Sequence, residues 1–205
     1  MRVGVLALQG DFEAHARVLD AQGARAIEVR RTAELRGLDG LVLPGAESTT
    51  LLNLMRDEPW FEELRGFHAG GGAFLATCAG AILVSRKVRN PEQPSLGLLD
   101  ATIERNGYGR QVDSFETGVE VPAVGGTVRA AFIRAPRFRA LGKGVEVLGR
   151  VGGEPVLVRE GRVLAMTFHP ELAGDGRLHG LFLDLAGESG RARAVTENER
   201  RAVAS

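Results

Sequence analysis

Residues 74–81 read Phe74-Leu75-Ala76-Thr77-Cys78-Ala79-Gly80-Ala81 and contain the only cysteine of the chain. An apolar run is followed by a turn of small residues and then by a second apolar run. This pattern predicts a buried strand that turns sharply into a helix, with Cys78 at the turn. Such a turn lifts a nucleophile out of a sheet and aims its sulfur at the helix N-terminus, where the dipole stabilises a thiolate. A lone cysteine is otherwise more often a small buried hydrophobe, so the flanking residues favour the nucleophile.

The first half of the chain alternates short apolar runs with amphipathic stretches. This order predicts an α/β fold, with a mostly parallel central sheet and helices on both faces. The expected strands are Arg2–Leu8, Ala24–Val29, Leu38–Leu43 and Ala73–Ala76, and the expected helices are Asp11–Gln22, Ser48–Met55 and Phe61–Ala69, with a helical turn at Thr32–Leu35.

The second half contains short strand candidates separated by Gly or Pro turns, which predict an antiparallel extension of the same sheet. These candidates are Leu98–Glu104, Gly118–Val121, Val128–Ile133, Val145–Val151, Pro155–Arg159 and Arg162–Phe168. Leu178–Leu185 is expected to form a closing helix. We expect residues 1–187 to form a single domain and the charged residues 188–205 to form a flexible C-terminal tail.

The amino-acid composition limits the classes of function that this chain can have. Apolar residues make up 44% of the 205 residues, charged residues 25%, and the formal net charge is zero. This balance gives no support for nucleic acid or an anionic membrane as a partner. The single cysteine and the short first apolar run, Met1–Leu8, favour a cytoplasmic location without a signal peptide. Glycine-rich dinucleotide or phosphate loops and zinc-type Cys/His spacings are missing from the sequence, so no cofactor and no metal are expected.

A second chemical motif, His169-Pro170-Glu171, follows the last strand candidate. A histidine after a strand is more often structural, but Pro170 disfavours the helical region for His169 and keeps it extended. Residues two apart in an extended chain point to the same side. Glu171 is therefore expected to reach one imidazole nitrogen while the other faces Cys78, as in a nucleophile–base–carboxylate triad.

Parallel topology would gather three strand ends at one sheet edge: Pro44–Ser48, Thr77–Gly80 and His169–Glu171. Pro44–Ser48 reads as a turn with Ser48 as helix cap, or as a source of backbone N–H groups for an oxyanion. Arg105 and Arg134 are candidates to bind a substrate carboxylate, although each alone is typical of a solvated surface.

The other three histidines, His15, His68 and His179, fall on expected helices without an adjacent carboxylate partner. We interpret them as surface or packing residues. His15 is a weak exception because it follows the end of the first strand.

Six segments in order carry a family resemblance: Leu8–Asp11, Leu43–Thr49, Thr77–Gly80, Arg105–Gln111, Phe132–Pro136 and Phe168–Glu171. Together they closely resemble the class I (triad-type) glutamine amidotransferases, and within them the glutaminase subunits of pyridoxal 5′-phosphate synthase. The resemblance covers roughly Met1 to Leu185. The cysteine and His-x-Glu motifs mark the wider class, whereas the first, fourth and fifth segments are specific to the subfamily.

The resemblance implies that Cys78 attacks the side-chain amide of L-glutamine, that His169 moves the proton and that Glu171 orients His169. A glutamyl thioester would then be hydrolysed to glutamate. By the same resemblance the oxyanion is held by Gly45, Ala46 and Ala79, and glutamine is bound by Ala46, Glu47, Ser48, Arg105, Ile133 and Arg134. Ala46 stands where the family usually has glycine, which would make a peptide flip at that position costlier.

The resemblance also implies a partner. Ammonia would pass through a channel to a separate (β/α)₈-barrel synthase subunit in a hetero-oligomer, and the glutaminase would be nearly silent until docked. Leu8–Gly10 would belong to the docking and oxyanion-control region. Two alternatives remain open: a stand-alone cysteine hydrolase of the same fold, such as a γ-glutamyl hydrolase, and a non-catalytic binding module.

Overall fold

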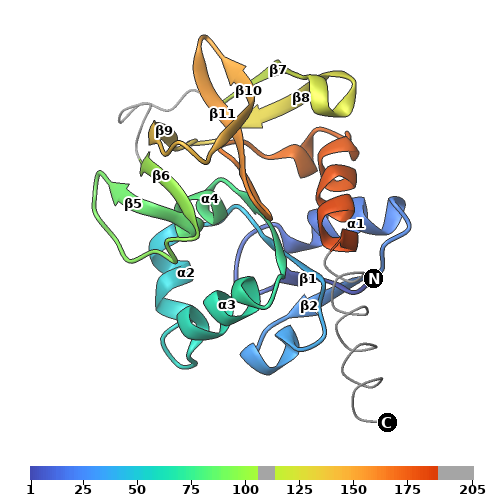
Figure 1. The fold of residues 1–205 in the computed structure, drawn as a ribbon, viewed down its shortest axis with the longest axis vertical. Coiled ribbons are helices and arrows are strands. Elements are labelled where there is room, and N and C mark those ends of the chain that lie inside the picture. Colours follow the sequence, from blue (N-terminus) through green and yellow to red (C-terminus); the bar gives the residue numbers. More distant parts are fainter. Residues whose placement is uncertain (106–113, 189–205) are drawn as a thin grey trace.

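A seven-stranded sheet forms the centre of the computed structural model, which describes residues 1–105 and 114–188 (Figure 1). The strand order is β10-β11-β12-β4-β3-β1-β2, and the pairs among β12, β4, β3, β1 and β2 are parallel. The bounds are β1 Val3–Leu6, β2 Ala26–Val29, β3 Gly40–Leu43, β4 Ala73–Thr77, β10 Glu146–Val151, β11 Glu154–Glu160 and β12 Val163–Met166.

Helices cover both faces of this sheet, as the fold class predicted (Figure 1). They are α1 Phe12–Ala21, α2 Ser48–Leu54, α3 Trp60–Ala69, α4 Ala79–Val84 and a closing helix over residues 177–188, with 3₁₀ turns η1 Thr32–Leu35, η2 Pro122–Val124 and η3 Pro170–Leu172.

Strand periodicity divides the core into two layers. Leu41, Leu43 and Phe74 belong to the cluster that includes residues of α2 and α3, whereas Val42 and Leu75 belong to the cluster that includes residues of α1 and the closing helix. Alternate residues of β3 and β4 therefore supply opposite faces. Continuous apolar runs of this kind are typical of parallel strands buried on both sides.

The second half differs from the sequence expectation in part. Of its strands, β10 and β11 extend the central sheet antiparallel, but β12 pairs parallel with β4. The remaining strands form two small separate sheets, β5-β6-β9 and β7-β8. Their bounds are β5 Ser85–Arg89, β6 Leu99–Glu104, β7 Phe115–Val121, β8 Gly126–Phe132 and β9 Arg137–Leu141.

Two helix details also differ from expectation. Glu47, not Ser48, caps α2, because its carboxylate accepts the N–H of Thr50. The fully buried residues of α1 are Ala14, His15 and Leu19. A histidine thus occupies part of the buried face of this helix.

No helix in residues 1–105 or 114–188 has the length and apolarity needed to cross a membrane. Most of the expected 188–205 tail, and the part of the Arg105–Gln111 segment after Arg105, lie outside the described residues.

Candidate active site

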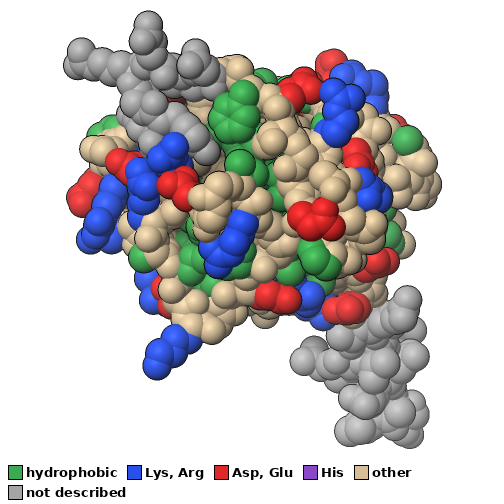
Figure 2. Space-filling model, turned by 90° about the horizontal axis from the view of Figure 1, so that it is seen from above, with side chains coloured by type: hydrophobic (Ala, Val, Ile, Leu, Met, Phe, Trp, Pro, Cys, Tyr) green, Lys and Arg blue, Asp and Glu red, His purple; other side chains and the backbone are tan. Residues whose placement is uncertain are grey.

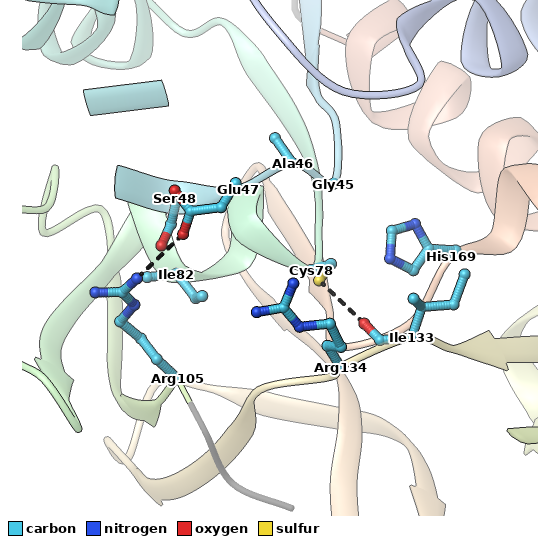
Figure 3. A pocket seen from close by; sticks show the side chains of 10 residues that line it. All are labelled: Gly45, Ala46, Glu47, Ser48, Cys78, Ile82, Arg105, Ile133, Arg134 and His169. Carbon is cyan, nitrogen blue, oxygen red and sulfur yellow. Dashed lines mark hydrogen bonds and ion pairs between the residues drawn. The ribbon is translucent and has the colours of Figure 1, made fainter. Parts of the chain in front are cut away.

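Cys78 lies on the turn between β4 and α4, at the carboxyl end of a central strand. Its backbone has φ 48° and ψ −102°, a region that L-residues rarely adopt. Strain of this kind persists only where the surrounding structure imposes it, and here the Cys78 N–H is held by the Met166 carbonyl at 2.9 Å. The side chain is 8% exposed and faces the pocket (Figure 3).

His169 follows β12 and approaches the same turn. Its backbone is extended, as Pro170 predicted, and its N–H donates to the Ala131 carbonyl at 2.8 Å. The imidazole Nδ1 lies 2.7 Å from Glu171 Oε1, and the Glu171 side chain is fully buried. The structure therefore brings His169 and Glu171 together beside Cys78.

The charge state of His169 follows from these neighbours. Burial alone would lower its pKa, but hydrogen bonds and charge interactions with Cys78 and Glu171 outweigh burial and raise the pKa to about 10. The imidazole is therefore cationic at neutral pH. The structure therefore places a cation beside the Cys78 sulfur.

A pocket of about 270 Å³ surrounds these groups (Figure 3). Loops and element ends that are remote in sequence supply its lining, which is polar on several sides. The lining residues are Gly45, Ala46, Glu47, Ser48, Cys78, Ile82, Arg105, Ile133, Arg134 and His169. All six substrate-binding candidates line it; Ala79 and Glu171 lie behind it.

Arg105 and Glu47 meet at one end of the pocket, with 3.5 Å between Arg105 Nη2 and Glu47 Oε1. The Arg105 side chain is only 12% exposed. Hydrogen bonds from Thr49 and Thr50, together with the charge of Arg105, outweigh burial and lower the pKa of Glu47. This end of the pocket thus holds one fixed cation and one fixed anion.

Arg134 and Ile133 form the opposite wall. Arg134 has φ 46°, a second strained residue at the pocket, and the Ile133 carbonyl oxygen lies 4.0 Å from Cys78 Sγ. Strained backbone at two walls of one pocket is typical of a functional site.

The expected oxyanion donors differ in availability. The Gly45 N–H donates to Thr77 Oγ1 at 2.9 Å, so in this conformation it is already paired. The Ala79 N–H belongs to the first turn of α4, where N–H groups have no partner inside the helix.

Glycine is required at position 45 for a steric reason. A Cβ there would lie 2.2 Å from His169 Cε1. The loop and the imidazole are therefore packed directly against each other.

Comparison with known proteins decides the family. The model of the SNO glutamine amidotransferase family matches residues 5–187. The chain belongs to this family. It is a glutaminase of the amidotransferase type, and its α/β fold is the one that the class predicts.

Relatives within the SNO family are about half identical to this chain. A pyridoxal 5′-phosphate synthase subunit PdxT of Thermus thermophilus is 54% identical over 187 residues, which are 90% of this chain and 97% of the relative. The protein of the same name from Deinococcus radiodurans is 49% identical, covering 92% and 98%.

Solved structures agree with this assignment. A crystal structure of a glutamine amidotransferase is 52% identical with a TM-score of 0.86, covering 91% of this chain and all of the other. The structure of PurLQS from Thermotoga maritima, at 17% identity and a TM-score of 0.70 over 89% and 97% of the chains, shares the fold.

His15 and His179 are fully buried and bonded to each other, so of the expected surface or packing roles they have the packing one; His68 is only partly buried. His15 also lies 3.4 Å from Glu171. One signal was available: His15 stands three residues after Phe12 and four before Leu19, the spacing of the buried face of a helix.

Proposed function

We propose that this SNO-family glutaminase is the ammonia-producing subunit of a pyridoxal 5′-phosphate (vitamin B6) synthase. It hydrolyses L-glutamine to L-glutamate and ammonia and delivers the ammonia to a (β/α)₈-barrel synthase subunit. The observation that carries the chemistry is the arrangement of Cys78 on a strained turn beside an imidazole whose other side is bonded to a buried carboxylate.

The first half of the reaction forms a thioester. The Cys78 thiolate attacks the side-chain amide carbon of glutamine, and the carbonyl oxygen becomes an oxyanion near the N–H groups of Ala46 and Ala79. When the C–N bond breaks, the His169 imidazolium gives its proton to the departing nitrogen. Ammonia leaves, and a glutamyl thioester remains on Cys78.

The second half uses the same groups in reverse. His169, now neutral, takes a proton from water, which attacks the thioester carbon. The C–S bond breaks, glutamate is released and Cys78 returns to the thiolate beside the imidazolium. Glu171 holds the imidazole through Nδ1 in both halves.

The remaining pocket residues suit the amino-acid end of glutamine. Arg105 and Arg134 present guanidinium groups to its carboxylate, whereas Glu47 and the Ile133 carbonyl present oxygens to its ammonium group. Ser48 and the backbone of Ala46 complete the binding wall, although Ser48 Oγ now donates to Gln93. The Ile133 carbonyl oxygen lies 4.0 Å from Cys78 Sγ, so it borders the same pocket as the nucleophile.

The domain organisation, cellular location and partners belong to the same proposal. Residues 1–187 act as a single domain within a cytoplasmic hetero-oligomer, and neither nucleic acid nor a membrane takes part. Basic and acidic side chains are interspersed over the face in Figure 2, in keeping with zero net charge.

The test mixes the chain with its cognate barrel subunit and supplies either glutamine or an ammonium salt. The wild type should support cofactor formation from both nitrogen sources, whereas Cys78→Ala should support it from ammonium alone. Glutamine-dependent formation by Cys78→Ala would refute the mechanism.

Two further results would favour the alternatives. Full glutaminase activity without the barrel subunit would favour a stand-alone hydrolase. Failure of a glutamine-mimicking electrophile to modify Cys78 in the complex would favour a non-catalytic module.

A further inference from the structure

Two fully buried histidines lie behind the catalytic carboxylate, outside the pocket. His15 comes from α1 and His179 from the closing helix, and His15 Nδ1 is 2.9 Å from His179 Nε2. A polar group without solvent access needs a partner, because an unpaired buried donor costs about 1–3 kcal/mol. The pair is therefore a fixed part of the interior.

The second ring nitrogen of His15 faces the site. Nε2 lies 3.4 Å from Glu171 Oε2 and 3.3 Å from Thr77 Oγ1. Glu171 uses its other oxygen, Oε1, for His169, and Oε2 accepts no well-aligned hydrogen bond from the described residues. His15 Nε2 is thus the polar group that the structure places against the free oxygen of the carboxylate.

Burial favours the neutral form of His15, which carries one ring proton. Burial, with the charges of His179 and His169, keeps its pKa well below the usual range. The burial of His179 likewise lowers its pKa, to about 4. Each ring then donates through one nitrogen and accepts through the other.

The position of these protons follows from the neighbours. If His15 carries its proton on Nδ1, the lone pair of its Nε2 faces the Glu171 carboxylate. His179 must then carry its own proton on Nδ1, and that buried N–H has no partner among the described residues. If His15 holds it on Nε2, the N–H points between Glu171 and Thr77, and His179 Nε2–H donates to His15 Nδ1. In the second arrangement Thr77 Oγ1 accepts from both His15 Nε2–H and the Gly45 N–H, and His179 Nδ1 keeps an unused lone pair. An unused lone pair costs less than the unpaired buried N–H of the first arrangement.

The geometry points to His15 as a positioning residue for the triad: its Nε2–H faces the second oxygen of Glu171 at 3.4 Å and donates to the hydroxyl of Thr77 at 3.3 Å. The first contact fixes the carboxylate that orients His169. The second fixes the hydroxyl that accepts the Gly45 N–H at 2.9 Å. One side chain of α1 thereby ties the triad carboxylate to the oxyanion loop, a role that rests on the proposed glutaminase reaction.

The test compares two amide side chains at position 15. The amide nitrogen of a glutamine would reach the place of Nε2, whereas that of an asparagine would reach only the place of Nδ1. In the complex with the barrel subunit, His15→Asn should lower kcat for glutamine hydrolysis about 10- to 100-fold with KM changed less than about threefold, because Glu171 loses its anchor while the pocket wall stays. His15→Gln should stay within about threefold of the wild type, as should the control His68→Gln on α3.

A second readout does not depend on glutamine turnover. The pKa of His169, followed by NMR of ¹⁵N-histidine-labelled chain, should fall in His15→Asn, because an unanchored Glu171 supports the imidazolium less, and should stay unchanged in His15→Gln. Equal kcat for the two variants, or a loss confined to KM, would overturn the role of His15. If the wild-type complex is inactive but the pKa of His169 still falls in His15→Asn, only the proposed function is contradicted.

Thermal unfolding of each variant identifies failure to fold. If His15→Asn does not fold, the role of His15 is tested by comparing His179→Gln with His179→Leu. The glutamine keeps a hydrogen-bond donor for His15 Nδ1, whereas the leucine removes it. A lower kcat in the leucine variant alone supports the positioning role of His15, and equal kcat in both variants refutes it.

Discussion

Cys78 adopts a backbone conformation that favours glycine, with φ 48° and ψ −102°. We therefore expect Cys78→Gly to be more stable than Cys78→Ala by about 1 kcal/mol, since glycine relieves the strain that alanine keeps. At an ordinary position glycine would instead be less stable than alanine by roughly 0.5–1 kcal/mol. Urea unfolding of the two inactive variants measures the difference, and the ordinary order would show that the turn stores no strain.

Gly45 packs directly against the imidazole of His169. In Gly45→Ala the new Cβ would fall 2.2 Å from His169 Cε1, so the ring must move away from Cys78. A displacement of about 1 Å is enough to cost about 10²-fold in rate. We expect kcat of the complex to fall by at least that factor, and unchanged kcat would mean that the loop, not the ring, gives way.

At the level of single helices, α3 contains a glycine, Gly66, where the structure leaves room for a larger side chain. Gly66 lies inside the helix, its φ is negative, and nothing lies within 4 Å of the position of a Cβ. Gly66→Ala should therefore raise the free energy of unfolding by roughly 0.5–1 kcal/mol without changing activity. Chemical denaturation checks the gain. A loss of stability would mean that the helix packs more tightly at this position than the structure shows.

Strands with short continuous apolar runs were predictable because their length and the Gly or Pro turns beside them favour a strand over a helix. The two strands missed, β5 and β9, are largely exposed: Ser85 and Val88 are the buried residues of β5, and Phe138 is the one of β9. Their sequences resemble loops because neighbouring strands, not burial, hold them in place. Local sequence does not encode such pairing.

The residues of the site likewise fall into those that the sequence could predict and those that it could not. Cys78, His169 and Glu171 carry local signals, a small-residue turn and a His-Pro-Glu spacing, so the sequence could propose them. The spacing of His15 could indicate burial, but nothing local to His15 or Thr77 indicates their partners, which lie more than thirty positions away. Only the folded chain brings these groups behind the triad.

At the scale of the whole molecule, the His15–His179 contact joins two helices that pack on one face of the central sheet. The pKa of His179 is lowered to about 4 by burial, which the charge of Asp175 only partly opposes. In the unfolded chain the same group titrates near its ordinary pKa of about 6.5. The folded state thus binds fewer protons than the unfolded state between these two pH values.

The sign of the resulting pH dependence is fixed by that difference. The contribution of His179 to stability is fully present above about pH 6.5 and is lost as the pH falls from about 6.5 through about 4, by on the order of 2 kcal/mol at about pH 5. Urea unfolding at about pH 7 and about pH 5 should therefore show a smaller loss in His179→Leu than in the wild type, with part of the loss retained through His15. The partly buried His68 supplies the control, because His68→Leu should lose nearly as much as the wild type. Equal losses in the wild type and His179→Leu would mean that water reaches the buried pair and that the two helices separate before the protein unfolds.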